Sequence, residues 1–257
     1  QAARRLVKLA EDPAKKDAKK VVLPGFKSIA QLRDHCGPAC CELYLSYFGM
    51  PGDQVEIARQ IKFPNGGTPV YAMRQFLETA GLEVRRLEAD LPTMKKVLDI
   101  GLPLILEEEY STSRHVAVAI GYDDARELLE VQDPMTHEIR ETPYEALPRL
   151  LGLANNGTIV AYPKTDDARR KALDDAGCIE SPYIPVVDAA WKAVDGKAYD
   201  DAEKLVEQAL SIRRDYELAW ICKWTVARHF VETNARGASS LESILDDIVK
   251  IWPDDEW

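Results

Sequence analysis

Three of the five cysteines, Cys36, Cys40 and Cys41, stand close together in the segment QLRDHCGPACCELYLSYFG. Such a cluster is compatible with a metal site, a reactive thiol or ordinary core packing. Gly37 and Pro38 follow the first cysteine and predict that a helix begins there. Unpaired backbone N–H groups and the positive end of the helix dipole then lie at Cys36. Both favour the thiolate, which is the nucleophilic form of cysteine.

Metal binding and core packing are the alternatives for this cluster. A closed zinc site needs about four ligands, usually as two paired clusters. Cys178 and Cys222 are isolated and far apart in the sequence, so we expect no metal site. Cys40 and Cys41 lie inside the predicted helix among large apolar residues, and free cysteine is among the most buried residue types. These two are therefore expected in the core, and Cys36 is the candidate nucleophile.

A reactive cysteine also needs a base, and the chain has four histidines. The side chain of His35 diverges from that of its neighbour Cys36 and is expected at the surface. His137 has no evident partner, and His229 lies among helices, where packing or exposure is typical. His115 opens the apolar segment HVAVAIGY, which predicts an imidazole at the end of a strand. A hydrogen-bonded histidine without a catalytic role is the alternative there.

The segment after His115 predicts a β-hairpin that supplies a carboxylate. If Asp123–Arg126 form its loop, His115 lies opposite Pro134 and one step from Asp133. Side chains on neighbouring strands are then within contact range. A carboxylate beside an imidazole fixes its tautomer and stabilises the imidazolium. Cys36, His115 and Asp133 would thus supply a nucleophile, a base and an orienting group.

The elements that must position these residues follow from hydrophobic spacing and turn residues. Strands are expected over residues 102–109, 115–122, 127–134 and 157–163. Helices are expected over residues 37–48, from Asp53 onward, over 68–81 with Thr68 as the N-cap, and over 91–101. This order of elements predicts an α+β domain in which helices pack on an antiparallel sheet.

Residues 165–257 are expected to be helical throughout. One helix should end near Gly196, the next should span Tyr199–Ile212, and a third should begin near Tyr216. This spacing resembles the tetratricopeptide repeat, a helix pair of about 34 residues. Arg214 stands where that pattern prefers proline, and one extra residue precedes Tyr199. A single repeat cannot bury its own faces, so these helices should stack on each other or on the first domain, and they could hold a protein partner.

Composition narrows the classes of protein. The chain has 257 residues and a net charge of −10, with no dominant basic stripe, so no nucleic-acid partner is expected. No apolar run approaches the roughly 20 residues that span a bilayer, and no signal peptide is evident. An odd number of cysteines without a regular framework favours a reducing, cytoplasmic location. The segment before Val21 is rich in Lys and Arg and is expected to be a solvated helix or tether.

Several motifs occur in an order that resembles a known family. CGPA, a helix ending in YFG, RHVAVAIGYD followed by LLEVQDP, and GTIVAYP resemble the bacteriocin-processing, double-glycine-leader peptidases. The resemblance covers roughly residues 24–163 and implies a papain-like cysteine peptidase fold that needs no metal or other cofactor. It divides the chain into an N-terminal segment, a peptidase domain and a helical domain, with the bounds 1–20, 21–164 and 165–257.

The resemblance also implies roles for four residues. Cys36 matches the family's nucleophile, His115 its general base and Asp133 its orienting acid. The family uses a glutamine upstream of the cysteine to donate a hydrogen bond to the oxyanion, and Gln31 is the candidate, with the Cys36 backbone N–H as second donor. Gln31 lies five residues before the cysteine instead of the usual six, and a bulge in the loop LRDH would absorb the difference.

The implied activity is cleavage of a peptide or protein substrate through a thioester on Cys36. Well-known family members are fused to membrane exporters, and no transporter segment occurs in this sequence, so specificity for double-glycine leaders does not follow. Papain-like folds also catalyse amidase, transamidase and acyltransferase reactions with the same triad. A third interpretation is a catalytically inactive scaffold that binds a partner through its helical region.

Overall fold

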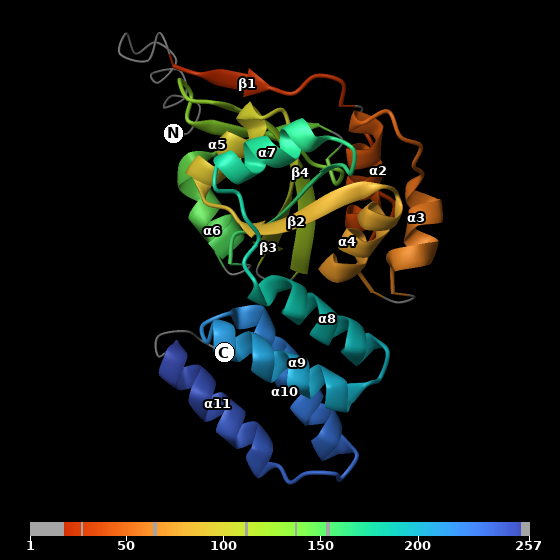
Figure 1. Cartoon of the computed structure of the whole chain (residues 1–257), viewed down its shortest axis with the longest axis vertical. Helices are drawn as coiled ribbons and strands as arrows, with labels where there is room; N and C mark the ends of the chain where they lie inside the picture. The colour runs from red at the N-terminus through yellow and green to blue at the C-terminus, as the bar shows by residue number, and fades with distance from the viewer. Residues whose placement is uncertain are drawn as a thin grey trace. The chain divides into compact units, whose positions relative to one another are not determined.

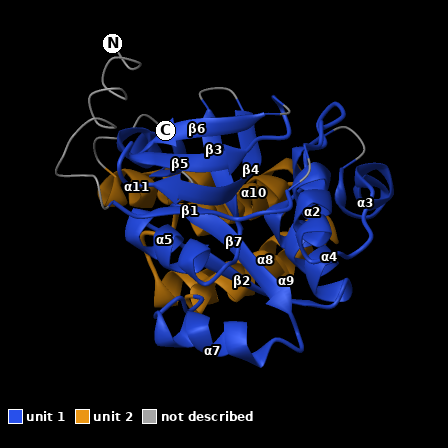
Figure 2. Ribbon diagram, turned by 90° about the horizontal axis from the view of Figure 1, so that it is seen from above, with its two compact units in different colours: residues 1–180 blue, residues 181–257 orange. Residues whose placement is uncertain are grey.

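The computed structural model describes residues 18–26, 28–63, 66–110, 113–136, 138–152 and 155–252. The chain divides into two compact units, residues 1–180 and 181–257, which Figure 2 colours separately. The expected N-terminal helix or tether falls almost wholly on residues 1–17, outside the described residues. The three-domain division expected from the sequence stays a prediction. Within the described ranges no helix is long and apolar enough to cross a membrane.

A seven-stranded antiparallel sheet forms the centre of the first unit (Figure 1). The four expected strands are present as β3 (Leu104–Tyr110), β4 (Ser113–Asp123), β5 (Leu128–Gln132) and β7 (Gly157–Pro163). Three strands were not expected, β1 (Lys20–Val22), β2 (Leu82–Glu88) and β6 (Ile139–Pro143). The strand order is β2-β7-β3-β4-β5-β6, and β1 pairs with β4. The missed strands are short or rich in charged residues: β1 has 3 residues, and β2 and β6 are the two edge strands of the sheet.

Helices cover both faces of this sheet. The first face packs against α2 (Cys36–Tyr47), α3 (Gln54–Ile61) and α4 (Val70–Thr79). The second face packs against α5 (Leu91–Asp99), α6 (Leu147–Leu151) and α7 (Asp167–Asp175). On β4, Val116 and Val118 belong to the first core, while Ala117 and Ala119 belong to the second, as the alternation of a strand requires. The predicted α+β class, with helices on an antiparallel sheet and a helical C-terminal region, is confirmed.

Local signals fix most helix ends in the first unit. Helix α2 ends before Gly49, which adopts a φ of 67° and accounts for the predicted stop. Asp53 caps α3 by accepting hydrogen bonds from two backbone N–H groups of its first turn. The prediction that Thr68 caps α4 is wrong, because Pro69 occupies the N-cap without a side-chain hydrogen bond. Thr68 packs against Gly37 instead.

The β4–β5 hairpin has a different register from the expected one. Asp123 pairs with Leu128, so the loop begins one residue later than predicted, and Glu127 closes it with a φ of 54°. The pairing also shifts at a bulge between Ala119 and Gly121. Strand β1 crosses Gly121 so closely that a Cβ there would lie 2.4 Å from a backbone oxygen of β1. The predicted pairing of His115 with Pro134 is therefore wrong.

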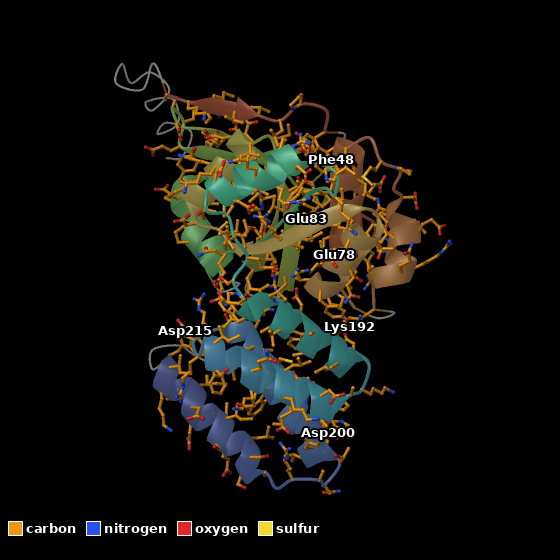
Figure 3. The ribbon with its side chains drawn as sticks, viewed as in Figure 1. Phe48, Glu78, Glu83, Lys192, Asp200 and Asp215 are labelled. Atoms are coloured by element: carbon orange, nitrogen blue, oxygen red, sulfur yellow. The ribbon has the colours of Figure 1, made fainter. Side chains whose placement is uncertain are left out.

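The second unit consists of helices that pack around a core of their own. Its helices are α8 (Tyr183–Asp195), α9 (Tyr199–Ile212), α10 (Glu217–Glu232) and α11 (Ser239–Ile251). The helix ends expected near Gly196, Tyr199 and Tyr216 are confirmed. Their apolar stripes meet in one cluster of buried residues, so the helices stack on each other as expected. Charged side chains such as Lys192, Asp200 and Asp215 are exposed (Figure 3). The tetratricopeptide-like character of these helices stays a prediction.

Candidate active site

Cys36 is the first residue of α2, as the sequence predicts. The chain reaches it through a tight turn, in which the His35 N–H donates to the carbonyl of Leu32 at 3.0 Å and Asp34 adopts a φ of 58°. His35 occupies the N-cap position but makes no side-chain cap hydrogen bond. The N–H groups of the first turn and the helix dipole therefore face the Cys36 side chain without a capping oxygen.

The thiol of Cys36 lies close enough to the imidazole of His115 for each group to shift the pKa of the other. Burial alone would raise the pKa of the Cys36 thiol. The hydrogen bond and positive charge of His115 outweigh burial, and backbone N–H groups of Val116 and Gly37 act in the same direction. The pKa of Cys36 is therefore lowered below its ordinary value, which favours the thiolate.

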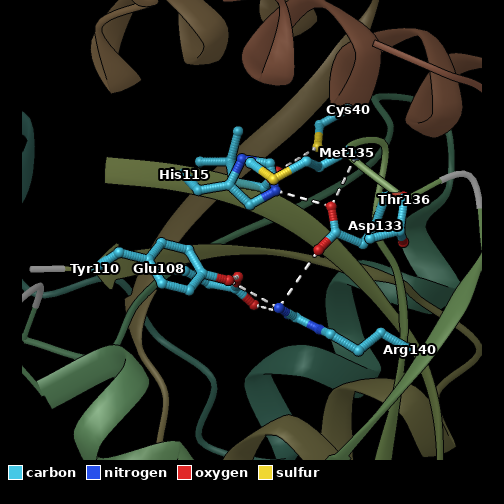
Figure 4. Close-up of polar contacts among 9 residues, drawn as sticks. Cys40, Glu108, Tyr110, His115, Asp133, Met135, Thr136 and Arg140 are labelled. Carbon is cyan, nitrogen blue, oxygen red and sulfur yellow. Dashed lines mark hydrogen bonds and ion pairs between the residues drawn. The ribbon is translucent and has the colours of Figure 1, made fainter. Parts of the chain in front are cut away.

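His115 is buried near the start of β4 and is held by Asp133. Its Nε2 lies 2.9 Å from Asp133 Oδ1, which leaves Nδ1 as the ring nitrogen available to Cys36 (Figure 4). Burial opposes the protonated imidazole, but hydrogen bonds with Asp133 and Cys36 raise the pKa of His115 to about 9. The arrangement favours an imidazolium at neutral pH and stabilises the thiolate of Cys36 relative to the thiol.

Asp133 follows the last residue of β5 and reaches back to His115 from the turn. Its Oδ1 also accepts the backbone N–H of Met135 at 2.9 Å, and its Oδ2 lies 3.4 Å from Arg140 Nη1 (Figure 4). Burial would raise the pKa of this carboxyl, but the hydrogen bond of His115, that of Met135 and the charge of Arg140 lower it. The expected contact between His115 and Asp133 is present although the register is not the predicted one.

Gln31 lies in the segment before the turn, and its neighbours are fixed by Gln54 at the start of α3. The Gln54 side-chain amide donates to the Ala30 carbonyl at 2.7 Å and accepts the Leu32 N–H at 2.8 Å. On the other edge, the Gln31 N–H donates to the carbonyl of Pro134 at 2.9 Å. The backbone around Gln31 is therefore held by hydrogen bonds from two sides, and one of them joins it to the turn that carries Asp133.

Three polar side-chain atoms in the segments around Cys36 are buried and lack a hydrogen-bond partner among the described residues. They are the amide oxygen of Gln31, Nδ1 of His35 and the hydroxyl of Thr68. A Cβ on Gly37 would lie 2.7 Å from Thr68 Cβ, so only glycine fits beside this threonine. Unsatisfied polar atoms are costly in a protein interior and mark places where water or a ligand binds.

The other cysteines lie where the sequence predicts. Cys40 and Cys41 are fully buried, and the Cys40 thiol donates to the carbonyl of Val116 at 3.3 Å. Burial raises the pKa of Cys40 and Cys41 well above the ordinary range. Burial also raises the pKa of Cys178, and that of Cys222 to about 12. Cys36 is thus the cysteine whose pKa is lowered, and the five thiols are all free.

The structure describes two of the other three histidines, His35 and His229. His35 is only half-exposed, so the prediction of a surface position is partly wrong, and its Nδ1 is buried without a partner among the described residues. His229 stacks on Tyr199 with ring centroids 3.5 Å apart, which is the expected packing role. His137 lies outside the described residues.

Glu108, His115 and Asp133 are the one group within the described ranges with ligand atoms close enough to hold a metal ion, all within 4.8 Å of one another. Carboxylates and imidazoles do bind zinc. Here, however, the guanidinium of Arg140 contacts both carboxylates. The positive charge of Arg140 thus already offsets the charge of both carboxylates, as a metal ion would.

Sequence reasoning missed Glu108, Arg140 and Gln54. Glu108 is fully buried at the end of β3, and Arg140 reaches it from the unexpected strand β6. The run of glutamates that ends β3 was a usable signal, since a strand end facing the core rarely carries unpaired charge. Gln54 gave no local signal, because its contacts are to a distant loop.

The model of the Peptidase_C39 like family matches residues 24–149. No curated protein matches the chain. A solved structure of the peptidase domain of Streptococcus ComA, a bi-functional ABC transporter, is 19% identical and covers 53% of this chain and 97% of its own, with a TM-score of 0.47. A double glycine motif protease from an AMS/PCAT transporter, in complex with the leader peptide, is 16% identical and covers 57% and 99%, with a TM-score of 0.44.

A third solved structure is the N-terminal peptidase C39 like domain of the toxin secretion ATP-binding protein from Vibrio parahaemolyticus. It is 15% identical and covers 52% of this chain and 100% of its own, with a TM-score of 0.42. The family match spans the elements that carry Cys36, His115 and Asp133. The resemblance predicted from the sequence is thereby confirmed at the level of the domain family: this chain contains a peptidase C39-like domain.

Proposed function

We propose that the chain is a cysteine peptidase that cleaves a peptide or protein substrate. The observation that carries the proposal is the position of His115, which is held by Asp133 at 2.9 Å and lies close enough to Cys36 for the two groups to shift each other's pKa. This is the arrangement of a nucleophile, a general base and an orienting carboxylate. The match to the C39-like family supports a peptide bond as the target.

In the proposed reaction, the Cys36 thiolate attacks the carbonyl carbon of the substrate and forms a tetrahedral oxyanion. Gln31 and the backbone N–H of Cys36 donate hydrogen bonds to this oxyanion. The imidazolium of His115 then gives its proton to the departing amine, which leaves a thioester on Cys36. His115 next takes a proton from water, and the resulting hydroxide cleaves the thioester and restores the thiolate.

Site-resolved alkylation tests whether Cys36 is activated. Near neutral pH, iodoacetamide should label Cys36 much faster than the other four cysteines, with modification located by mass spectrometry. Cys222→Ala is the matched control and should leave the labelling rate of Cys36 unchanged. Equal rates at all five cysteines would contradict the proposal.

Product analysis then tests the reaction itself. A diverse peptide library should yield cleaved products with the native protein and none with Cys36→Ala. Adding a primary amine separates hydrolysis from transfer: amide adducts in the products would indicate a transamidase or acyltransferase. Rapid labelling of Cys36 without any product would favour a scaffold that has kept the site but not the activity.

The second unit is proposed to hold a protein partner. Its buried core leaves charged side chains on the outer helix faces, which suits a polar and reversible contact. Its resemblance to tetratricopeptide repeats and the three-domain division remain part of this proposal.

A further inference from the structure

Four neighbouring strands bring one ionisable side chain each to the same end of the sheet. Glu108 lies near the end of β3, His115 near the start of β4, Asp133 just after β5 and Arg140 near the start of β6. Glu108 and His115 are directly paired across their strands. Because neighbouring strands are antiparallel, the end of one meets the start of the next. Four groups that are distant in sequence therefore form one cluster (Figure 4).

Arg140 is the cation of this cluster and contacts both of its carboxylates. Its Nη2 donates to Glu108 Oε1, and its Nη1 lies 3.4 Å from Asp133 Oδ2. The same Nη1 donates to the hydroxyl of Tyr110 at 2.8 Å, and that hydroxyl donates to the second oxygen of Glu108 at 2.8 Å. One guanidinium thus offsets two buried negative charges at once.

His115 faces ionisable groups from every element packed around it. Asp133 holds its Nε2, and the carboxylate of Glu108 lies within 4.8 Å of a ring nitrogen. The ring of Tyr110 lies 6.2 Å away between centroids, and Cys36 reaches the imidazole from α2. Among the described residues no hydrogen bond or ion pair joins Arg140 to His115, whereas Arg140 contacts both carboxylates that lie beside the imidazole.

We propose that Arg140 is a positioning residue for the reaction, a role that rests on the proposed function. It holds Asp133 by Oδ2, the oxygen that His115 leaves free. It also cancels the charge of Glu108 beside the imidazole. Without Arg140, two uncompensated carboxylates would face the Cys36–His115 pair. Negative charge nearby favours the protonated form of both groups, so the thiolate would form only at higher pH.

The decisive measurement is the alkylation rate of Cys36 as a function of pH. This rate falls at low pH because the thiolate is protonated, and we call this falling part of the profile its acid limb. Arg140→Gln should move this acid limb to higher pH by about one unit, and Glu108→Gln should move it to lower pH by about the same amount. The double variant should return the limb towards that of the native protein. A purely structural role would not produce shifts of opposite sign.

Arg126 provides a matched control. Arg126 lies in the loop between β4 and β5 and makes a bidentate ion pair with Glu141 of β6. This loop follows the end of β4, whereas His115 lies near its start. Arg126→Gln should leave the acid limb in place, and Arg140→Lys should restore part of the shift because it keeps the charge without the planar fork. Thermal unfolding of each variant confirms that the measured species is folded.

The outcomes separate this inference from the proposed function. If native Cys36 reacts no faster than the other cysteines, the proposed function fails. If native Cys36 reacts rapidly but Arg140→Gln and Glu108→Gln leave the limb in place, or move it in the same direction, the role of Arg140 is overturned. Should Arg140→Gln not fold, Glu108→Gln decides: a shift to lower pH supports the proposal, and any other result overturns it.

Discussion

The consecutive glutamates Glu107 and Glu108 of β3 are both buried and both contact an arginine, yet they face different surroundings on the two sides of the sheet. Because side chains alternate along a strand, they project to opposite faces. Glu107 accepts two hydrogen bonds from Arg86, at 2.7 and 2.8 Å. Glu108 shares its arginine with Asp133 and lies beside His115.

The difference between the two pairs shows when a buried charge affects chemistry. Arg86 and Glu107 form a fork-to-fork contact between β2 and β3, and the backbone N–H of Arg86 donates to Glu180, so loss of this pair should mainly change stability. The pair of Glu108 and Arg140, by contrast, lies beside the imidazole of His115, which gains and loses a proton. Burial and ion pairing are common to both regions; a neighbouring imidazole with a shifted pKa distinguishes the region of Glu108.

Removing the titrating group should have the largest effect on the reactive region. His115→Ala deletes the base and the cation that stabilises the thiolate, so peptide cleavage should fall by about 10²–10⁴-fold. Alkylation of Cys36 near neutral pH should slow as well, because the thiol pKa returns towards its ordinary value.

Steady-state cleavage and site-resolved alkylation measure these two effects. His229→Ala is the control, since that ring packs against Tyr199 and Phe230 in the second unit. Unchanged alkylation in His115→Ala would remove His115 from the site and erase the contrast between the two regions.

The Arg86–Glu107 pair should respond in the opposite way, with a change in stability and none in reactivity. Glu107→Gln removes the carboxylate that pairs with the buried charge of Arg86, and breaking a buried ion pair typically costs about 3–5 kcal/mol of unfolding free energy. Urea denaturation measures that loss. The pH profile of Cys36 alkylation should stay in place, in contrast to the shift expected for Glu108→Gln. A shifted profile in Glu107→Gln would show that the two faces of β3 are electrically coupled.

Residues that carry their own local signal could be predicted from the sequence. Cys36 precedes a glycine and a proline at a helix start, His115 opens an apolar strand, and Asp133 follows a hairpin. Even with the wrong register, Asp133 reaches His115 because it lies in a turn that folds back instead of continuing β5. The bulge at Gly121 could not be read, because it depends on the approach of β1.

Residues that act through the tertiary structure could not be predicted. Arg140 belongs to the polar edge strand β6, whose sequence lacks an apolar alternation. Gln54 begins a surface helix, and nothing in its local sequence indicates the loop that it holds. Thr68 follows a loop and looks like an N-cap, but its contact with Gly37 depends on how α4 lies beside α2.

The pH dependence of the native protein sharpens the comparison further. The pKa of Cys36 is lowered, so the thiolate is lost only as the pH falls through that lowered value. Alkylation should then drop about tenfold for each further pH unit. The pKa of His115 is raised to about 9, so the imidazolium is lost as the pH rises through that value.

Peptide cleavage should therefore decline on both sides, whereas alkylation should decline only on the acid side, because a thiolate needs no proton donor to react with iodoacetamide. Rate profiles of both reactions on the same preparation make the comparison. An alkaline decline in alkylation as well would mean that deprotonation of His115 disturbs the site beyond the loss of its proton.

The smallest effect is expected from an uncharged contact, that of the Gln54 side chain. It tests whether charge alone distinguishes the surroundings of His115 from those of the Arg86–Glu107 pair. Gln54→Ala removes both hydrogen bonds that fix the backbone around Gln31, so the oxyanion donor should be less well placed. The full loss of such a donor costs on the order of 10²–10³ in rate, and a misplaced donor should cost about tenfold, in kcat and with little change in KM.

Gln60→Ala is the matched control for that experiment, since Gln60 is exposed on the same helix and bonds only a carbonyl of α3. The acid limb of Cys36 alkylation should not move in Gln54→Ala, because no charge changes. A lowered kcat with a fixed limb would show that position and charge act separately at this site. A shifted limb would instead mean that the loop of Gln31 also sets the electrostatics of the thiol, since Gln31 is tied through Pro134 to the turn that carries Asp133.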